Sequence, residues 1–314
     1  MKQTILLIIG FVLFWNSGFI GADYGLPFTE PNTLMFFRYA GVALILFLFL
    51  FIRQRFYVPE WPALWRSMVI GGLAHGMWLL CVLIALNDGV PPGIVALVVG
   101  LQPLTTGAFS GLATGERTSL MGWIGLVLGF IGVALSVGFR IDFGDLSSIF
   151  SYFVLLVSVA SITVASLMQR HIGLYTPRLE LPVDISLFYQ SIGTLVLVTL
   201  PAILAEGLYV ELNVPFTLTI SWLTIGVSIG AYAFMWLLLE RINATRVASL
   251  FYLGPPVTML MDWAAFGTVP NMMDFVGLAV IFTGVFVTYL PLLLKKSPPA
   301  LYSANGRITD LTQA

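Results

Sequence analysis

Charged side chains are scarce in this chain: Asp, Glu, Lys and Arg make up 9% of its 314 residues. Soluble domains carry roughly 25% charged residues, so the composition argues against a solvent-exposed globular domain. Cysteine occurs once, which excludes an intramolecular disulfide. The two histidines, His75 and His171, lie far apart without the spacing of metal ligands. The net charge of −1 says nothing about partners, because the charges lie in loops. We expect no metal, no cofactor and no nucleic-acid partner.

Long apolar stretches take the place of the missing charges, and 59% of the residues are hydrophobic. A transmembrane helix needs about 20 apolar residues to cross a hydrocarbon core about 30 Å thick. The first stretch has no clear small-x-small cleavage site, so we treat it as a retained helix and not as a signal peptide. The sequence predicts an all-α membrane protein with ten transmembrane helices, at residues 4–22, 34–52, 66–86, 93–114, 121–139, 146–168, 184–205, 218–239, 246–266 and 273–294.

Basic residues indicate how these helices are oriented. All Lys and Arg residues except Arg38 and Arg140 fall on one side of the ten-helix topology. Because Lys and Arg accumulate in cytoplasmic loops, both termini are predicted to be cytoplasmic.

An internal repeat divides the chain. Residues 101–137 reappear at residues 253–289, offset by 152, with eleven identities in 37 positions. Each copy would hold five spans, and an odd number reverses the orientation of the second copy, as in transporters with inverted repeats. We therefore expect a first five-helix repeat at 1–145, a second, inverted one at 146–296 and a cytoplasmic tail at 297–314.

Short motifs are distributed over both halves. They are Trp15-Asn16-Ser17, Phe37-Arg38-Tyr39, Leu101-Gln102-Pro103, Gly115-Glu116, the run 244–250 and Tyr252-Leu253-Gly254-Pro255. Their order and spacing over about residues 5–294 resemble an EamA-type member of the drug/metabolite transporter superfamily. The resemblance implies a multi-pass protein of the bacterial inner membrane that exports small metabolites. One departure is that the second copy has Gly267-Thr268 where a Gly-Glu pair is expected, so that acidic position is not carried over.

Two prolines occupy matched positions of the repeats, Pro103 and Pro255. A proline within a helix removes a backbone donor and frees a carbonyl one turn earlier, and in lipid that carbonyl must be satisfied by protein or cavity water. We expect both prolines to kink their spans and face each other across a central cavity. The alternative is that they only bend the helices for packing.

Polar and aromatic residues within spans are the candidates for substrate binding, because burial in hydrocarbon is costly for polar groups without a partner. They are Trp15, Asn16, Arg38, His75, Trp78, Gln102, Pro103, Tyr189, Gln190, Tyr232, Tyr252 and Pro255. Interfacial belts are an alternative place for Trp and Tyr, and Arg38 could instead extend its stem to a water interface in a structural role.

Coupling to protons would require an ionisable group within the membrane. Asp262 is the one acidic residue that the sequence places inside a span, and His75 is the other candidate. Since neither is compelling, we favour facilitated diffusion or exchange.

The expected cavity suits small zwitterionic or neutral metabolites, above all amino acids, because aromatic faces bind ammonium groups and amides bind carboxylates. Cationic drugs are an alternative, and nucleotide sugars or phosphate metabolites fit less well because only Arg38 could meet a phosphate. A polytopic enzyme is disfavoured by the absence of H-E-x-x-H and G-x-S-x-G motifs. A channel would more often show a polar ring made by oligomer symmetry.

Glycines spaced by four residues suggest close helix packing, either within the chain or in a homodimer. They are Gly72 and Gly76, Gly107, Gly111 and Gly115, Gly125 and Gly129, and Gly226 and Gly230.

Overall fold

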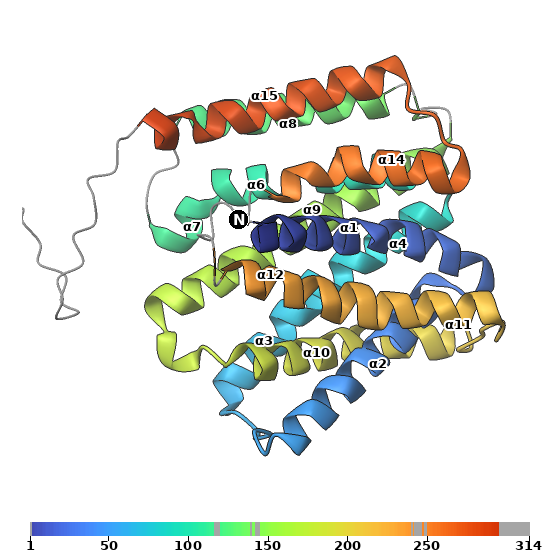
Figure 1. Cartoon of the computed structure of the whole chain (residues 1–314), viewed down its shortest axis with the longest axis vertical. Helices are drawn as coiled ribbons and strands as arrows, with labels where there is room; N and C mark the ends of the chain where they lie inside the picture. The colour runs from blue at the N-terminus through green and yellow to red at the C-terminus, as the bar shows by residue number, and fades with distance from the viewer. Residues whose placement is uncertain are drawn as a thin grey trace, which may run out of the picture.

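The structure is a computed structural model that describes residues 2–115, 120–138, 140–141, 145–239, 241, 247 and 250–294. The predicted cytoplasmic tail at 297–314, Glu116 and most of the motif at 244–250 lie outside the described residues. The described chain is almost entirely helical (Figure 1). An isolated antiparallel bridge joins Thr29 to Val210.

The first half contains eight α-helices, a 3₁₀ turn (η1) and a π-helical segment (η2). In chain order these are α1 Lys2–Gly25, η1 Leu26–Phe28, α2 Pro31–Ile52, α3 Trp61–Gly71, η2 Gly72–Met77, α4 Trp78–Asn87, α5 Pro92–Val99, α6 Gln102–Ala108, α7 Ser110–Thr114 and α8 Leu120–Val137.

The described part of the second half contains a similar series, in which η3 and η5 are 3₁₀ turns and η4 is π-helical. The elements are α9 Leu146–Tyr175, η3 Pro177–Leu179, α10 Val183–Leu204, α11 Val214–Ser221, η4 Trp222–Ala231, α12 Tyr232–Leu239, η5 Phe251–Leu253, α14 Gly254–Phe266 and α15 Met272–Leu294.

Seven helical segments of the described chain are long and apolar enough to cross a membrane. They are Gln3–Phe28, Pro31–Ile52, Trp61–Asn87, Leu120–Val137, Leu146–Tyr175, Val183–Leu204 and Val214–Met235. Shorter apolar helices cover Pro92–Ala108 and Met272–Thr288, and α14 is a further short helix. The protein is therefore an all-α, multi-pass membrane protein, and the count of ten spans stays a prediction.

Pro103 and Pro255 each follow a short interruption of regular α-helix, and the kink expected there from the sequence stays a prediction. Each lies in the first turn of a new helix: Pro103 follows the start of α6 at Gln102, and Pro255 follows the start of α14 at Gly254. A first-turn residue has no intrahelical acceptor for its N–H, so proline loses nothing there. The regular α-helix is interrupted just before each proline, at Gly100 and Leu101 before Pro103 and in η5 before Pro255.

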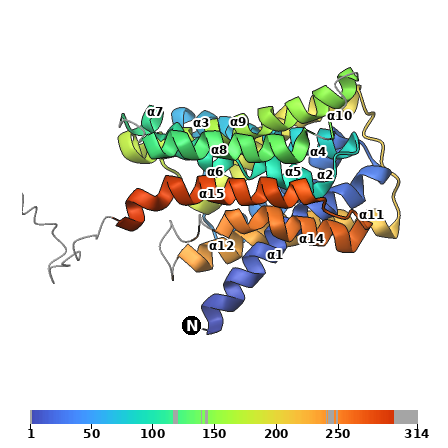
Figure 2. The same cartoon turned by 90° about the horizontal axis from the view of Figure 1, so that it is seen from above.

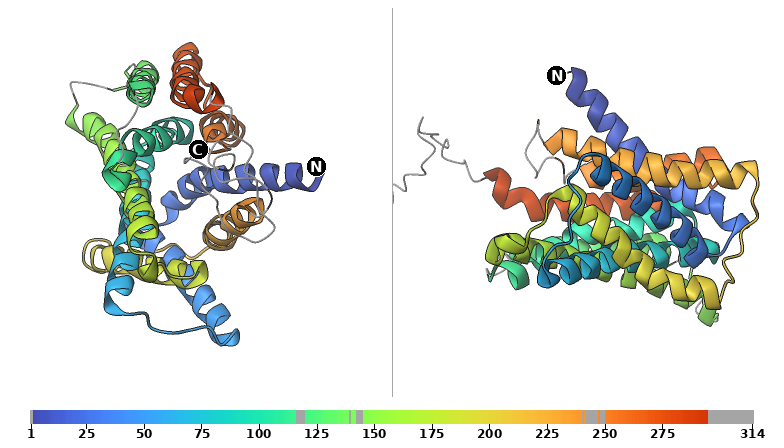
Figure 3. Two further views of the ribbon diagram at one scale, coloured as in Figure 1. Left: turned by 90° about the vertical axis from the view of Figure 1, so that its left-hand side faces the viewer. Right: turned by 90° about the horizontal axis from the view of Figure 1, so that it is seen from below.

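A tightly packed pair, α8 and α15, stands at one edge of the molecule (Figures 1 and 2). Figure 3 (left) shows the same pair in a view nearly along the helix axes. The helices meet through Gly125 and Gly132 of α8 and Gly277 and Gly284 of α15, where an added Cβ would overlap the facing backbone. This glycine face of α8 is therefore occupied within the chain, and a homodimer through glycine faces stays a prediction.

The long helix α9 has a defined start outside the apolar spans. Asp145 is its N-cap and accepts hydrogen bonds from Ser147 and from the backbone N–H of Ser148. The bond from the Ser147 hydroxyl is the largest cause that lowers the pKa of the Asp145 carboxyl below its usual value. An ionised Asp145 caps the helix more strongly, because its charge faces the positive end of the helix dipole.

Candidate substrate cavity

A cavity of about 440 Å³ lies where the helices break, between the α5–α6 and η5–α14 junctions and the facing sides of α1, α4 and α9. Seven residues predicted for substrate binding line it: Trp15, Asn16, Trp78, Gln102, Pro103, Tyr232 and Pro255. Both first-turn prolines thus border one shared space. The seven residues come from five elements that are separated in the chain, α1, α4, α6, α12 and α14, so folding is required to assemble this wall.

A second cavity of about 750 Å³ adjoins the first, and the two share Ile162, Ser166, Arg170, Tyr232 and Met235 as lining residues. It contains two more predicted residues, His75 and Gln190, and reaches Gly173 and Glu180 near the C-terminal end of α9. Arg170 therefore also borders both cavities, which corrects the expectation that Arg38 is the single arginine available to a ligand.

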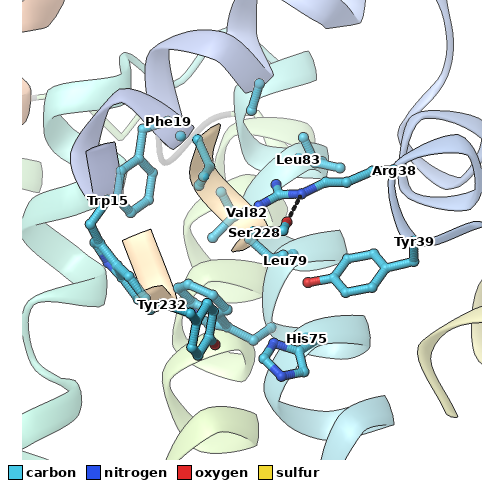
Figure 4. Close-up of a pocket in the computed structure, with 14 residues that line it drawn as sticks. Trp15, Phe19, Arg38, Tyr39, His75, Leu79, Val82, Leu83, Ser228 and Tyr232 are labelled. Atoms are coloured by element: carbon cyan, nitrogen blue, oxygen red, sulfur yellow. Dashed lines mark hydrogen bonds between the residues drawn. The ribbon is translucent and has the colours of Figure 1, made fainter. Parts of the chain in front are cut away.

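Trp15 is the centre of an aromatic cluster. Its ring centroid lies 4.9 Å from that of Phe251, 5.6 Å from that of Tyr232 and 6.4 Å from that of Trp78. The rings come from α1, α4, η5 and α12, and the close-up in Figure 4 shows Trp15 and Tyr232 on one side of the pocket. Flat faces of this kind bind apolar groups and cations.

Two predicted tyrosines lie elsewhere. Tyr189 donates its hydroxyl to the backbone carbonyl of Tyr57 at 2.9 Å and packs against Phe188, so it supports the loop between α2 and α3. Tyr252 is buried in η5. Neither borders the two cavities described above, and their assignment to the substrate site stays a prediction.

The π-helical segments are the feature of the site that the sequence did not predict. His75 lies in η2, and Ser228 lies in η4 just before Tyr232. A π-helical turn widens the backbone and occurs frequently at functional sites. The glycine pairs Gly72/Gly76 and Gly226/Gly230, which suggested packing faces, coincide with these segments and were the signal that could have located them.

His75 is held by a short hydrogen-bonded chain. Gln190 donates Nε2–H to the Ser186 hydroxyl at 2.9 Å, which turns Oε1 toward His75 Nε2 at 3.0 Å. Because Oε1 can only accept, this arrangement places a proton on Nε2 of His75. The ring is fixed in orientation at the edge of the cavity.

Asn16 links α1 to α14. Its Nδ2 donates to the carbonyl of Val12 at 2.7 Å, and its Oδ1 accepts from the Thr258 hydroxyl at 3.1 Å. A structural role for Asn16 accounts for both of its polar groups, although its side chain also borders the cavity.

Arg38 does not extend to a water interface, which corrects the alternative drawn from the sequence. Its side chain is buried, with 6% of the residue exposed, and Nε donates to the Ser228 hydroxyl at 2.9 Å. Figure 4 shows the guanidinium group beside Ser228, facing the same pocket as Tyr39, His75 and Tyr232. Trp15 and Trp78 also line this pocket.

Buried acidic residues lie away from the large cavities. Asp262 is 2% exposed and accepts a hydrogen bond from the backbone N–H of Gly93 at 2.9 Å. Asp274, at the start of α15, is 1% exposed and forms a two-point ion pair with Arg140, both contacts being 2.8 Å. The sequence had suggested that Asp262 is the one acidic residue inside a span. Among the described helices, Asp274 is buried as well.

At the helix ends opposite Arg170 and Glu180, hydrogen bonds and an ion pair connect the first half of the chain to the second. Glu206 accepts hydrogen bonds from the backbone N–H groups of Asn32 and Thr33, at 3.0 and 2.6 Å, and from both of their side chains. The Asp262–Gly93 bond and the Arg140–Asp274 pair lie at the same ends of their helices. The cavities are therefore closed at this end and extend toward the other.

Comparison with protein families adds to this geometry. The model of the EamA-like transporter family matches residues 2–138. Over these residues the chain is similar to the EamA-like transporter family. The similarity is consistent with the drug/metabolite transporter superfamily.

The similarity to curated relatives extends over nearly the whole chain. The uncharacterized inner membrane transporter YedA of Escherichia coli (strain K12) is 25% identical over 301 residues, 94% of each chain. The uncharacterized transporter YdfC of Bacillus subtilis (strain 168) is 25% identical over 92% of each chain. A probable amino-acid metabolite efflux pump of Salmonella typhimurium (strain LT2) is 23% identical over 91% of this chain and 94% of its own.

A solved crystal structure has the same fold. It covers 94% of this chain and 99% of its own, with a TM-score of 0.65 and 21% sequence identity.

Proposed function

We propose that this protein is a secondary transporter that carries small metabolites, most favourably amino acids or related compounds, across the membrane by alternating access. The observation that carries the proposal is the aromatic cavity, which is closed at one end by contacts between the two halves and extends toward the other. A carrier requires such a site that is reached from one side at a time.

The proposed architecture is two inverted five-helix repeats, at 1–145 and 146–296. Its support is an exchanged packing pattern: α1 packs against η4, α12 and α14, while α9 packs against η2, α4 and α6. The π-helical segments also correspond, since residues 72–77 shifted by 152 become 224–229, within η4. In the inverted arrangement the cavity lies between the repeats.

The proposed orientation follows from the basic residues, with both termini in the cytoplasm. In this orientation Arg170 and Glu180 lie at the cytoplasmic end of the cavity, and Glu206, Asp262 and Asp274 close the outer end. The protein would then be open to the cytoplasm, as an exporter in the bacterial inner membrane is when it loads its substrate.

The proposed substrate class rests on the cavity lining. Aromatic side chains surround a space of about 440 Å³, within the range of roughly 300–1,000 Å³ typical of small-molecule sites. The buried cation at Arg38 disfavours cationic drugs, because like charges repel strongly where water is excluded. An amino acid presents an overall neutral zwitterion to this site.

A phosphate-metabolite exchanger is the second candidate. The observation that favours it is Arg170, which gives the connected cavities a second arginine besides Arg38. Arginine binds phosphate through paired N–H groups. The two arginines line different pockets, however. The site would therefore bind one phosphate group less well than one carboxylate.

Transport in reconstituted liposomes tests these proposals. Vesicles loaded with unlabelled amino acids, nucleosides, hexose phosphates or a quaternary ammonium dye are assayed for counterflow of the labelled compound, with protein-free vesicles as the control. We expect saturable, temperature-dependent counterflow with amino acids. Counterflow with hexose phosphates alone would support the exchanger, and non-saturable flux would indicate a channel.

A further inference from the structure

Arg38 is a buried cation without a counter-ion in the described part of the chain. The ion pairs among the described residues are Arg55–Asp184 and Arg140–Asp274. The one hydrogen bond of the Arg38 guanidinium within the same residues is the bond from Nε to Ser228. Arg38 is the eighth residue of α2, about 10 Å along that helix from the outer end of α2.

Such a cation is expensive to maintain, because burial removes most of its hydration and no carboxylate replaces it. The geometry leaves it prepared for a ligand. Ser228 occupies Nε, so the two terminal nitrogens remain available, and together they form the planar fork that matches a carboxylate.

A second donor lines the same pocket. The indole N–H of Trp78 is buried and has no hydrogen-bond acceptor among the described residues, and Trp78 is 7% exposed. Tryptophan can only donate through this atom. Two donors in one pocket that both lack an acceptor indicate an anionic or carbonyl group supplied by a ligand.

The pocket is small and its lining is mainly apolar. It has about 40 Å³ of free space and is bordered by Leu79, Val82 and Leu83. A site for one water needs roughly 10–15 Å³ of such space, so this pocket suits a group of a few atoms and not a sugar ring. Trp15, Trp78 and Tyr232 border both this pocket and the 440 Å³ cavity, so a larger substituent can occupy the adjoining space.

We propose that Arg38 and Trp78 bind the carboxylate of the transported metabolite, that Ser228 positions the Arg38 guanidinium, and that the remainder of the metabolite lies against Trp15 and Tyr232. The substrate is accordingly a small monocarboxylate. This assignment rests on the proposed transport function and names the chemical group that the same cavity recognises.

Matched ligand pairs test the assignment on the unaltered protein. Binding of L-phenylalanine, L-leucine, L-threonine and L-glutamine is compared with binding of their α-carboxamides by thermal shift of the full chain in detergent. The acid that binds best should bind about 10- to 100-fold more tightly than its amide, the loss expected for a charge-assisted hydrogen-bonded pair. Equal affinities for acid and amide, or no binding by any of the four acids, would overturn the proposal.

Variants test which residues cause the difference in affinity between the acid and its amide. Arg38→Gln and Trp78→Phe should reduce the acid-to-amide affinity ratio, and Ser228→Ala should reduce it by a smaller factor because it only releases the guanidinium. Arg53→Gln is the control, since it removes the same charge from the exposed end of α2. An unchanged ratio in Arg38→Gln contradicts the proposal, and if that variant does not fold, the ligand pairs on the unaltered protein decide.

The result can be separated from the transport function. Saturable counterflow of a compound without a carboxylate would retain the transporter and reject the Arg38 subsite. Arg38-dependent binding of acids without counterflow in liposomes would retain the subsite and reject transport.

Discussion

The carboxylate of Asp262 accepts a hydrogen bond of 2.9 Å from the backbone N–H of Gly93 and so caps a helix of the other half of the chain. Gly93 lies in the first turn of α5, whose own N-cap residue is Pro91 and provides no side-chain cap. The first N–H groups of a helix have no intrahelical acceptor. Asp262 of α14 supplies that acceptor, so it joins the two halves at the closed end of the cavities.

Asp262→Asn should leave transport largely intact. Asparagine keeps an oxygen that can accept from Gly93, and the proposed mechanism does not require a proton on this residue. At pH 6 and again at pH 8, the counterflow rate of the variant should be similar to that of the unaltered protein. Abolished transport with normal expression would instead identify Asp262 as a coupling residue.

Asp262→Ala is the complementary change, because it leaves the buried N–H of Gly93 without an acceptor. An unsatisfied buried donor costs about 1–3 kcal/mol, so thermal unfolding should occur at a lower temperature than in Asp262→Asn. Equal unfolding temperatures for the two variants would show that the cap contributes nothing.

Glu206→Gln should weaken the contact between α10 and α2. The carboxylate accepts from four donors of Asn32 and Thr33, and an amide would turn its own donor toward one of them. Hydrogen bonds to charged groups contribute about 1.5–3 kcal/mol, so the unfolding temperature should fall. Glu211→Gln is a matched control in the same loop, where the exposed side chain contacts Asn213 at 3.2 Å. A similar loss in both variants would contradict a specific role for Glu206.

The sequence predicted the helices well because apolar runs and prolines act locally. The predicted stretch at 34–52, for example, lies within α2, and Pro103 and Pro255 do follow interruptions of regular α-helix. Membrane spans need internal hydrogen bonding throughout, so a long apolar run has few alternatives to a helix.

The contacts of a side chain were harder to predict than the helix to which it belongs. Arg38 is buried because Ser228, which is 190 positions away, lies beside it in the fold. Tyr189 is removed from the cavity by a contact with Tyr57. The π-helical turns that present His75 and Ser228 coincide with glycines spaced by four residues, but that spacing is also typical of ordinary helix packing and did not identify them.

Trp15→Ala should weaken substrate binding. The ring contacts Phe251, Tyr232 and Trp78, and aromatic pairs contribute about 0.5–1.5 kcal/mol each beyond the area they bury. We expect the concentration for half-maximal counterflow to rise by about tenfold, which corresponds to 1.4 kcal/mol. Trp123→Ala is the control, since that side chain is 42% exposed on α8. A comparable effect from both tryptophans would indicate loss of folding and not of a binding surface.

Gly71→Ala should destabilise the protein and disturb the site together. A Cβ at Gly71 would overlap the backbone of Gln190 in α10, and Gln190 is the residue that orients His75. Because backbone atoms cannot move aside as a flexible side chain does, overpacking here should cost about 1–3 kcal/mol. The adjacent Gly72 is the matched control: a Cβ there meets its nearest atom, the carbonyl oxygen of Gly193, at 3.7 Å, an ordinary contact. Gly72→Ala should therefore unfold near the temperature of the unaltered protein, and Gly71→Ala below it. If both variants unfolded at the same temperature, the close approach of α3 to α10 would not be a determinant of stability, and His75 would have to be held in place by other contacts.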